Sequence, residues 1–463
     1  TMFHTKVIEK LLPISSKRRE TYDLFLKGGR ILVNEGWNSF WMSYRAYRWS
    51  KGRFVDNTSF LNNIYEKLPI SLQHVATSIY GYYLIKQRYG KHYLRKLNEL
   101  RSRNEKVFDY NKYQLDELNR FLQYAKRNSP YYQEKLINIS LPLKSIEELK
   151  EIPVTTKEDI RANIDNIVTI DKSKSIKVYT GGTTGKSLSV FYTIENMQER
   201  MAILDYFKEQ HGFYKGMKRA SFTGKVLIPM QQKKKVFWRY NYPLKQLLFS
   251  SFHLTDENIP YYIKALNKFK PMALDGFPSV MVRIAEFALK NDIKFTFKPI
   301  AIFPTAETIN DYDREVLEKA FSCKVRNQYA SSEGAPFITE CKEGNLHLNI
   351  DTGVFEKLDP TADISEVLVT SFTTYGTPLI RYKIGDVLEF TDEKCSCGII
   401  TPIIKRIIGR NTDFLYSRER GKIHAANLAN SVKYLPRSVK QVQFVQDKID
   451  EIIIEYEKAI NND

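Results

Sequence analysis

Cysteine is scarce in this sequence, and long apolar runs are missing. The 463 residues include four cysteines, too few for the disulfide framework of a small secreted protein, so the composition suits a reducing compartment. The longest charge-free stretch, 68–85, still contains serine, glutamine, histidine, threonine and glycine. We therefore expect a buried or interfacial helix there rather than a membrane span.

Secretion signals, repeats and nucleic-acid-binding motifs are also missing. The basic start of the chain is not followed by an apolar core and a cleavage site, as a secretory signal would require. No fixed-period repeat or low-complexity tract occurs, and hydrophobic residues make up 43% of the chain, which is typical of a folded protein. We expect a cytoplasmic globular protein of two or three domains without a nucleic-acid partner.

Acidic residues are much fewer than basic residues in the N-terminal part of the chain, whereas the two are nearly balanced in the rest. The chain carries a net charge of +18, and residues 1–130 hold 24 lysines and arginines against 11 acidic residues. Residues 1–67 are interpreted as a basic aromatic helical extension. Its basic run Lys17-Arg18-Arg19 is accompanied by three tryptophans, two tyrosines and one phenylalanine: Trp37, Trp41, Trp49, Tyr44, Tyr47 and Phe40. Two interpretations stay open: contact with an anionic membrane or a lipid-linked glycan, or a solvated helical face packed on the body by its aromatic residues.

A glycine-rich loop follows a short predicted strand. The loop reads Thr180-Gly181-Gly182-Thr183-Thr184-Gly185-Lys186-Ser187. Glycines let backbone N–H groups approach an anion, hydroxyls add donors, and lysine adds a charge, so the composition favours phosphate binding. It is not a Walker A loop, because the first glycine of that motif is missing and the next residues, 188–192, alternate like a strand. A hairpin turn is the alternative interpretation.

Strand and helix patterns alternate after residue 128. The region from 68 to about 128 is helical and stops at Ser129-Pro130. The pattern then predicts strands at 175–179, 271–274, 300–303 and 324–329, with helices at 279–290 and 311–321. Short strands dominate from His347 onward, including 366–370 and 378–383, and a pair of strands covers 441–457. This order predicts an α/β fold with α/β sheets, a β-rich subdomain and a small, apparently short C-terminal α+β lobe.

Three further motifs follow the glycine-rich loop in a fixed order. They are Arg326-Asn327-Gln328-Tyr329-Ala330-Ser331-Ser332-Glu333-Gly334, then Thr377 to Asp386, then Gly409-Arg410-Asn411-Thr412-Asp413. In this order the chain resembles the adenylate-forming (acyl-CoA synthetase-like) superfamily, in the phenylacetate-CoA ligase branch and its CapK-like capsular polysaccharide biosynthesis proteins. The resemblance extends from about Leu68 to the C-terminus. It implies an adenylating domain at 68–408, with a hinge and a partial C-terminal lobe at 409–463.

The resemblance implies a site for ATP and Mg²⁺. Lys186, with the loop residues Thr180 to Gly185, would hold the β- and γ-phosphates, and Glu333 would hold Mg²⁺. Tyr329 would lie against adenine, with Ala330 where glycine is usual. Ser332 would face the α-phosphate, and Ser331 would be a further nucleotide-binding residue. Asp386 would accept the ribose hydroxyls, and Arg410 would reach the ribose or a phosphate from the hinge. Ala306 and Glu307, in a turn at 303–307, would face the adenine.

A second strand-to-helix turn completes the implied site. Gly276, Phe277, Pro278 and Ser279 follow a predicted strand and precede a helix, where α/β sheets place ligand-facing loops. The resemblance makes this turn one wall of the carboxylate pocket. Independently of that role, we expect Ser279 to be a helix N-cap.

Three cysteines and one histidine form a candidate metal site. Cys341 and His347 are separated by five residues, and Cys395 and Cys397 by one. Three thiols and one imidazole are a ligand set of closed structural zinc sites. Zinc and free thiols both stay open, although related family members carry the same pattern. Cys323 is left over, and we expect it to be buried.

The resemblance predicts an ATP-dependent, AMP-forming ligase. Such an enzyme activates a carboxylic acid as acyl-adenylate and passes the acyl group to CoA, a carrier thiol or an amino sugar, here in surface polysaccharide biosynthesis. Asp413 is the expected hinge residue. A C-terminal lysine that contacts the reacting carboxylate in the superfamily cannot be assigned. The alternative is therefore a catalytically reduced adenylating fold that binds nucleotide and tethers glycan-assembly machinery to the inner face of the membrane.

Overall fold

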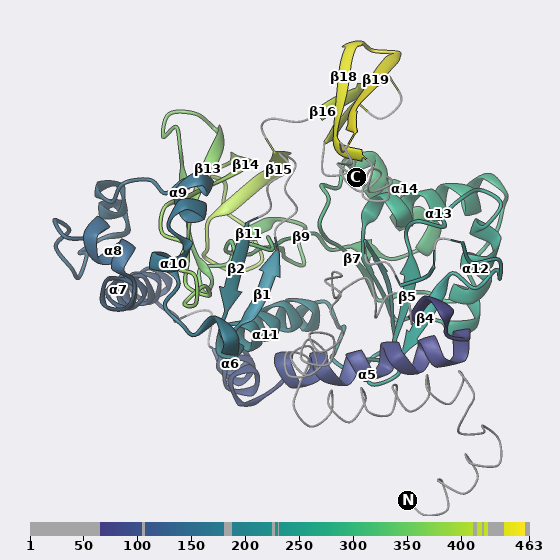
Figure 1. The fold of residues 1–463 in the computed structure, drawn as a ribbon, viewed down its shortest axis with the longest axis horizontal. Coiled ribbons are helices and arrows are strands. Elements are labelled where there is room, and N and C mark those ends of the chain that lie inside the picture. The colour runs from purple at the N-terminus through teal and green to yellow at the C-terminus, as the bar shows by residue number, and fades with distance from the viewer. Residues whose placement is uncertain are drawn as a thin grey trace, which may run out of the picture.

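The computed structural model describes residues 65–103, 107–179, 188–224, 227–229, 231–410, 414–418, 421–424 and 439–458. Figure 1 shows two sheet-containing bodies side by side, with a C-terminal strand hairpin projecting beyond them. The glycine-rich loop with Lys186, the hinge residue Asp413 and residues 1–64 lie outside the described residues.

Helices cover 70–135, close to the predicted range. They are α5 (Ile70–Arg88), α6 (Lys91–Ser102), α7 (Tyr110–Asn128) and α8 (Pro130–Lys135). The buried residues of α5 are Gln73, Thr77, Gly81 and Leu84, a stripe at helical spacing. A Cβ at Gly81 would come within 2.0 Å of the Asn241 side chain, so glycine allows α5 to approach the sheet closely. No helix among the described residues is long and apolar enough to cross a membrane.

A six-stranded sheet forms the core of one body, in the order β4-β5-β3-β6-β7-β8. The strands are β3 (Arg219–Thr223), β4 (Trp238–Asn241), β5 (Gln246–Ser250), β6 (Ala273–Gly276), β7 (Ala301–Pro304) and β8 (Lys324–Val325). All neighbours are parallel except β4 and β5. The helices of this body are α11 (Ile194–Gln210), α12 (Ile259–Phe269), α13 (Pro278–Lys290) and α14 (Asp311–Phe321). All four residues of β7 are buried, as expected for a covered parallel sheet.

The second body contains a seven-stranded antiparallel sheet, in the order β12-β13-β14-β15-β11-β10-β9. Its strands are β9 (Gln328–Tyr329), β10 (Ile338–Glu340), β11 (Leu346–Leu348), β12 (Gly353–Lys357), β13 (Ile364–Ser371), β14 (Tyr382–Phe390) and β15 (Ile403–Arg410). Its largest apolar core joins α7 and α8 to this sheet. The remaining elements are η1 (Ile146–Glu151), α9 (Lys157–Ala162), α10 (Ile164–Ile167), η2 (Lys172–Lys174) and the hairpin of β1 (Ile176–Tyr179) and β2 (Ser189–Tyr192).

The C-terminal part forms two strand pairs within the described residues. They are β16 (Phe414–Ser417) with β17 (Gly421–His424), and β18 (Val439–Lys448) with β19 (Glu451–Lys458). The predicted strand pair at 441–457 is confirmed. The α/β class with a β-rich subdomain and a small C-terminal part is confirmed as well.

Three predicted strands need correction. The single strand expected at 324–329 is divided between the two sheets: β8 ends at Val325, and the Asn327 N–H then donates to Glu340 of the other sheet at 2.9 Å. The strand expected at 378–383 begins at Tyr382, because Arg381 has a left-handed backbone with φ 44°. Asp386 therefore lies inside β14 and not at a strand end. The strand expected at 271–274 is shifted to Ala273–Gly276.

Candidate functional site

Glu333 is a buried carboxylate in the loop between β9 and β10. Its side chain is 2% exposed, and neither carboxylate oxygen has a hydrogen-bond partner among the described residues. The Lys157 ammonium lies 3.4 Å from Oε1. Burial raises the pKa of Glu333 above its ordinary value. A buried anion with free lone pairs next to one cation is a group prepared to accept a further positive partner.

The loop that carries Glu333 is fixed by side chains from two strands, β2 and β13. The Tyr192 hydroxyl, at the end of β2, donates to the Ser332 carbonyl at 3.1 Å. The Ser371 hydroxyl donates to the Gly334 carbonyl at 2.5 Å. Within the loop, the Ser331 hydroxyl accepts from the Gly334 and Ala335 N–H groups at 3.2 and 2.9 Å. The backbone on both sides of Glu333 is therefore held in place.

Arg200 of α11 is a further support that sequence reasoning missed. It is buried, and its guanidinium donates to the carbonyls of Gly334 and Ala335 at 3.2 Å each and to the Thr373 hydroxyl at 2.7 Å. It also lies 4.2 Å from the ring centroid of Phe337. No sequence signal marks Arg200, because α11 carries several other charged residues and its buried positions do not form a simple apolar stripe.

Lys157 was also missed. It is the first residue of α9, and its neighbour Thr155 is bonded to β14: the Thr155 N–H donates to the Arg381 carbonyl at 3.0 Å, and the Lys383 N–H donates to the Thr155 carbonyl at 2.9 Å. Thr156 and Asp159 form a capping box that starts α9. The box could be read from the sequence, but the contact between Lys157 and Glu333 depends on the tertiary fold.

Three residues predicted for the nucleotide lie together. The Tyr329 hydroxyl donates to Oδ2 of Asp386 at 2.6 Å, and Nε of Arg410 lies 3.3 Å from Oδ1. Asp386 and Arg410 are directly opposite each other on β14 and β15. The sequence motifs did not indicate that the tyrosine hydroxyl would hold the aspartate. This contact brings the second, third and fourth motifs into one cluster.

The two strand-to-helix turns are joined to each other. The Ser279 N–H and hydroxyl donate to the two carboxylate oxygens of Glu307, each at 3.0 Å. Ser279 is therefore not the N-cap of α13; that position is Phe277, and Pro278 is the first helical residue. Gly276 has φ 119°, and a Cβ there would lie 1.9 Å from the Phe222 carbonyl oxygen, so this turn requires glycine. Ala306, next to Glu307, has φ 69°.

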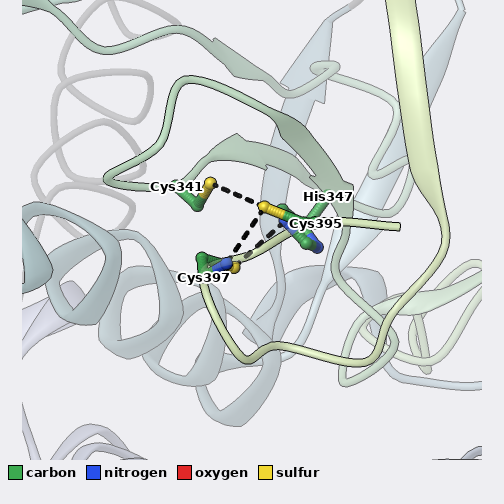
Figure 2. Close-up of side chains that lie close together, drawn as sticks. All are labelled: Cys341, His347, Cys395 and Cys397. Atoms are coloured by element: carbon green, nitrogen blue, oxygen red, sulfur yellow. Dashed lines mark hydrogen bonds between the residues drawn. The ribbon is translucent and has the colours of Figure 1, made fainter. Parts of the chain in front are cut away.

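The four cysteine and histidine residues converge, as Figure 2 shows. Cys341 follows β10, His347 is in β11, and Cys395 and Cys397 lie in the connection from β14 to β15. Their potential ligand atoms all lie within 4.8 Å of one another. The sulfurs of Cys341 and Cys395 are 3.6 Å apart, and Cys397 Sγ lies 3.4 Å from His347 Nε2. Burial lowers the pKa of His347, which favours the neutral, ligating imidazole. Cys323 is half-buried and lies outside this group.

The chain resembles known proteins along most of its length. A family model described as the CapK C-terminal domain matches residues 415–463. Protein CapK of Staphylococcus aureus is 50% identical over 398 residues, covering 85% of this chain and 88% of that protein. Phenylacetate-coenzyme A ligase of Thermus thermophilus is 23% identical over 330 residues, covering 66% of this chain and 71% of that protein.

Solved structures resemble the fold. 2-Hydroxyisobutyryl-CoA ligase, in complex with 2-HIB-AMP and CoA in the thioesterification state, has a TM-score of 0.55 at 19% identity, covering 77% of this chain and 80% of that chain. The same ligase in the postadenylation state with 2-HIB-AMP has a TM-score of 0.54 at 18% identity, covering 76% and 78%. The fold is similar to that of the adenylate-forming CoA ligases. The 50% sequence identity to protein CapK, over most of both chains, establishes that this chain belongs to the CapK family.

Proposed function

We propose that this chain is an ATP-dependent, AMP-forming ligase. A carboxylate oxygen of the acid attacks the α-phosphorus of ATP, the bond from that phosphorus to the bridging oxygen breaks, and pyrophosphate leaves. The acyl group of the adenylate then passes to CoA or to another thiol or amine. The observation that carries the proposal is Glu333, a buried carboxylate whose two oxygens accept no hydrogen bond from the described residues and which is close in sequence to Tyr329 of the cluster with Asp386 and Arg410.

The Glu333 carboxylate is suited to bind Mg²⁺. Mg²⁺ is commonly bound through one or two carboxylates together with substrate phosphates, and both Glu333 oxygens are free of hydrogen bonds from the described residues. Bound Mg²⁺ would neutralise phosphate charge during the displacement. Lys157, 3.4 Å from Oε1, offsets the carboxylate charge and would be drawn toward the phosphates as the second cation of the site.

The nucleotide is assigned to the tyrosine and aspartate cluster. Asp386 would bind the ribose hydroxyls, with Tyr329 and Arg410 orienting its carboxylate through the contacts at 2.6 and 3.3 Å. Tyr329, Ala330, Ala306 and Glu307 would surround the adenine, and Ser331 and Ser332 would face the α-phosphate. Lys186 and the loop Thr180 to Gly185, outside the described residues, would hold the β- and γ-phosphates.

The carboxylic acid is assigned to the turn of Gly276, Phe277, Pro278 and Ser279. Its bonds to Glu307 support this proposal, because they join the acid-binding turn to the turn proposed for adenine. The acyl acceptor is proposed as CoA, a carrier thiol or an amino sugar of a surface polysaccharide. Membrane or glycan attachment is proposed for residues 1–67, of which 1–64 lie outside the described range.

Structural zinc is proposed for the cysteine and histidine cluster. With Zn–S bonds of about 2.3 Å, a tetrahedral site separates two sulfurs by roughly 3.8 Å, and Cys341 and Cys395 are 3.6 Å apart. Four ligands would close the site to substrate, so the metal would hold two connections together rather than take part in the reaction.

Acid-dependent exchange between pyrophosphate and ATP tests the proposed reaction. A panel of carboxylic acids is screened with the full chain and Mg²⁺, and we expect exchange with at least one acid class. Glu343→Gln, an exposed glutamate outside the cluster, is the matched control for site variants. Measurable ATP binding without exchange for any acid would instead support the catalytically reduced, nucleotide-binding fold.

A further inference from the structure

A cavity lies at the edge of the six-stranded sheet opposite to the two strand-to-helix turns. The proposed acid and adenine turns follow the carboxyl ends of β6 and β7, at Gly276 and Pro304. At the amino ends of the parallel strands, Lys218 precedes β3, Lys245 precedes β5, and Met272 precedes β6. These residues line a cavity of about 640 Å³, which is within the range of small-ligand sites, roughly 300–1,000 Å³.

The lining of this cavity is basic and aromatic. We call it the basic cleft, and define it by three lysines, two tyrosines and one methionine: Lys218, Lys245, Lys270, Tyr240, Tyr242 and Met272. The three segments that contribute these residues, 211–219, 239–246 and 264–273, contain no aspartate or glutamate. Lys245 and Lys270 form no ion pair with a residue in the described part of the chain. The cleft therefore concentrates positive charge that nothing nearby in sequence offsets.

Backbone geometry at two of the lysines supports a ligand role. Lys245 has φ 45° and Lys270 has φ 51°, in the left-handed region that glycine occupies at lower free energy. Lys270 is the residue after α12, where glycine is the usual choice. A non-glycine residue in the left-handed region costs free energy, and such positions cluster at active sites and ligand-binding sites. Both of these lysines line the same cavity.

The aromatic and thioether side chains of the basic cleft indicate that its ligand has an uncharged part next to its charged group. Tyr242 is 70% exposed although it is a large aromatic residue, and Met272 is exposed too. The Lys218 ammonium donates to the Phe269 carbonyl at 3.5 Å and lies 5.5 Å from the centre of that ring. Aromatic and thioether surfaces beside ammonium groups suit a phosphate ester whose other part is a sugar ring or an apolar chain.

We propose that the basic cleft binds a phosphate ester, at a site separate from the ATP and acid sites. The chemistry fits two sources, a free sugar phosphate or the phosphate headgroup of a lipid. The proposal does not rest on the proposed ligase reaction: the cleft lies at the amino ends of β3, β5 and β6, the acid and adenine turns follow the carboxyl ends of β6 and β7, and the other motif residues belong to the seven-stranded sheet.

The test measures binding by the full chain at one fixed ionic strength, since salt screens such contacts. The probes are glucose 1-phosphate, and vesicles of phosphatidylcholine with or without phosphatidylglycerol. The cleft variant is Lys245→Gly with Lys270→Gly. Glycine relieves the left-handed backbone at both positions, so the variant should fold with a melting temperature no lower than that of the unchanged protein and with unchanged pyrophosphate exchange. The control removes the same charge elsewhere, with Lys112→Ala and Lys144→Ala, two exposed lysines of the other body.

We expect at least one probe to bind, with at least fivefold weaker binding by the cleft variant and no change in the control. Glucose 1-phosphate binding would identify a free sugar phosphate as the source, and binding to anionic vesicles alone would identify a lipid headgroup. The proposal is overturned if neither probe binds, if the cleft variant binds as tightly as the unchanged protein, or if the control loses as much affinity.

Discussion

Glu333 combines a proposed function with a cost in stability. Its carboxylate is buried and accepts no hydrogen bond from the part of the chain that the structure describes, and burial raises its pKa. We expect Glu333→Gln to reduce pyrophosphate exchange at least a hundredfold, about 2.7 kcal/mol, because the amide cannot replace the anionic metal ligand. The same change removes a buried charge, so the melting temperature without ATP and Mg²⁺ should rise. Calorimetry and exchange assays on one preparation check both. Unchanged exchange would remove Glu333 from the site.

Lys157 is a second residue whose role can be isolated. If it acts as a cation toward the phosphates, Lys157→Met should slow exchange at saturating ATP by about tenfold or more, and Lys157→Arg should recover part of that loss, because it keeps the charge. A purely structural lysine would give the opposite pattern: lower melting temperature in both variants and a normal rate per folded molecule. Lys144→Met, on the surface, is the control for losing a lysine.

Between elements, one buried ion cluster joins α6 to the loop before β12. Asp351 accepts from the Lys96 ammonium at 2.9 Å and from both Arg103 guanidinium nitrogens at 2.6 and 2.8 Å. Burial alone would raise its pKa, but Arg103 and Lys96 hold the pKa at about 2. Asp351→Asn removes the buried carboxylate partner of both cations and leaves them the more exposed Glu99, 2.7 Å from Lys96 and 3.4 Å from Arg103, so we expect a loss of about 3 kcal/mol at neutral pH, the lower end of the range for a broken buried pair.

The pH dependence gives the sign of this contribution. Because the pKa of Asp351 is lowered on folding, its stabilisation is complete above the unfolded value of about 3.9 and is lost as the pH falls toward 2. The stability gap between wild type and Asp351→Asn, measured by denaturant unfolding, should therefore narrow below pH 4. Asp116→Asn, on the exposed face of α7, should show no such gap. A gap independent of pH would contradict the ionic explanation.

The cysteine and histidine cluster joins the β10–β11 hairpin to the β14–β15 connection. If it holds zinc, metal analysis should give about one zinc per chain. Chelation or Cys395→Ser should then lower the melting temperature more than the exchange rate per folded molecule. Cys323→Ser, outside the cluster, controls for the loss of a thiol. Purified protein without zinc would leave the thiols free.

Elements with strong local signals were predictable, and contacts between distant segments were not. The helix at 311–321 was expected and found within the same bounds, because its periodicity is local. Arg381 shows the opposite case: its left-handed backbone depends on bonds to the 150–152 turn and to Thr370, so the predicted strand there was wrong. Motif order indicated that Tyr329, Asp386 and Arg410 belong to one site. Lys157 and Arg200 reach that site only through tertiary packing, and no local pattern marks them.

At the scale of the whole molecule, the proposed two-step reaction requires the C-terminal part to change orientation. The CapK C-terminal family model begins at 415, next to the proposed hinge residue Asp413. We expect Asp413→Pro to leave acyl-adenylate formation within about tenfold of wild type, roughly 1.4 kcal/mol, and to slow acyl transfer strongly. Single-turnover assays with preformed adenylate measure the second step alone. Equal loss in both steps would argue against a rotation.

The pairing of Asp386 with Arg410 has a thermodynamic consequence. Both oxygens of Asp386 already have partners, Tyr329 and Arg410, and Arg410 is the last residue of β15 before the chain leads toward the C-terminal part. A ribose bound to Asp386 would compete for or share those oxygens, and would change how firmly the end of β15 is held. The coupling is reciprocal. If bound nucleotide changes the equilibrium between two orientations of the C-terminal part by some factor, the ratio of nucleotide affinities in those two orientations equals that factor. The Asp386 carboxylate would thus couple ribose binding to the orientation of the C-terminal part, because the ribose hydroxyls and Arg410 would both depend on it.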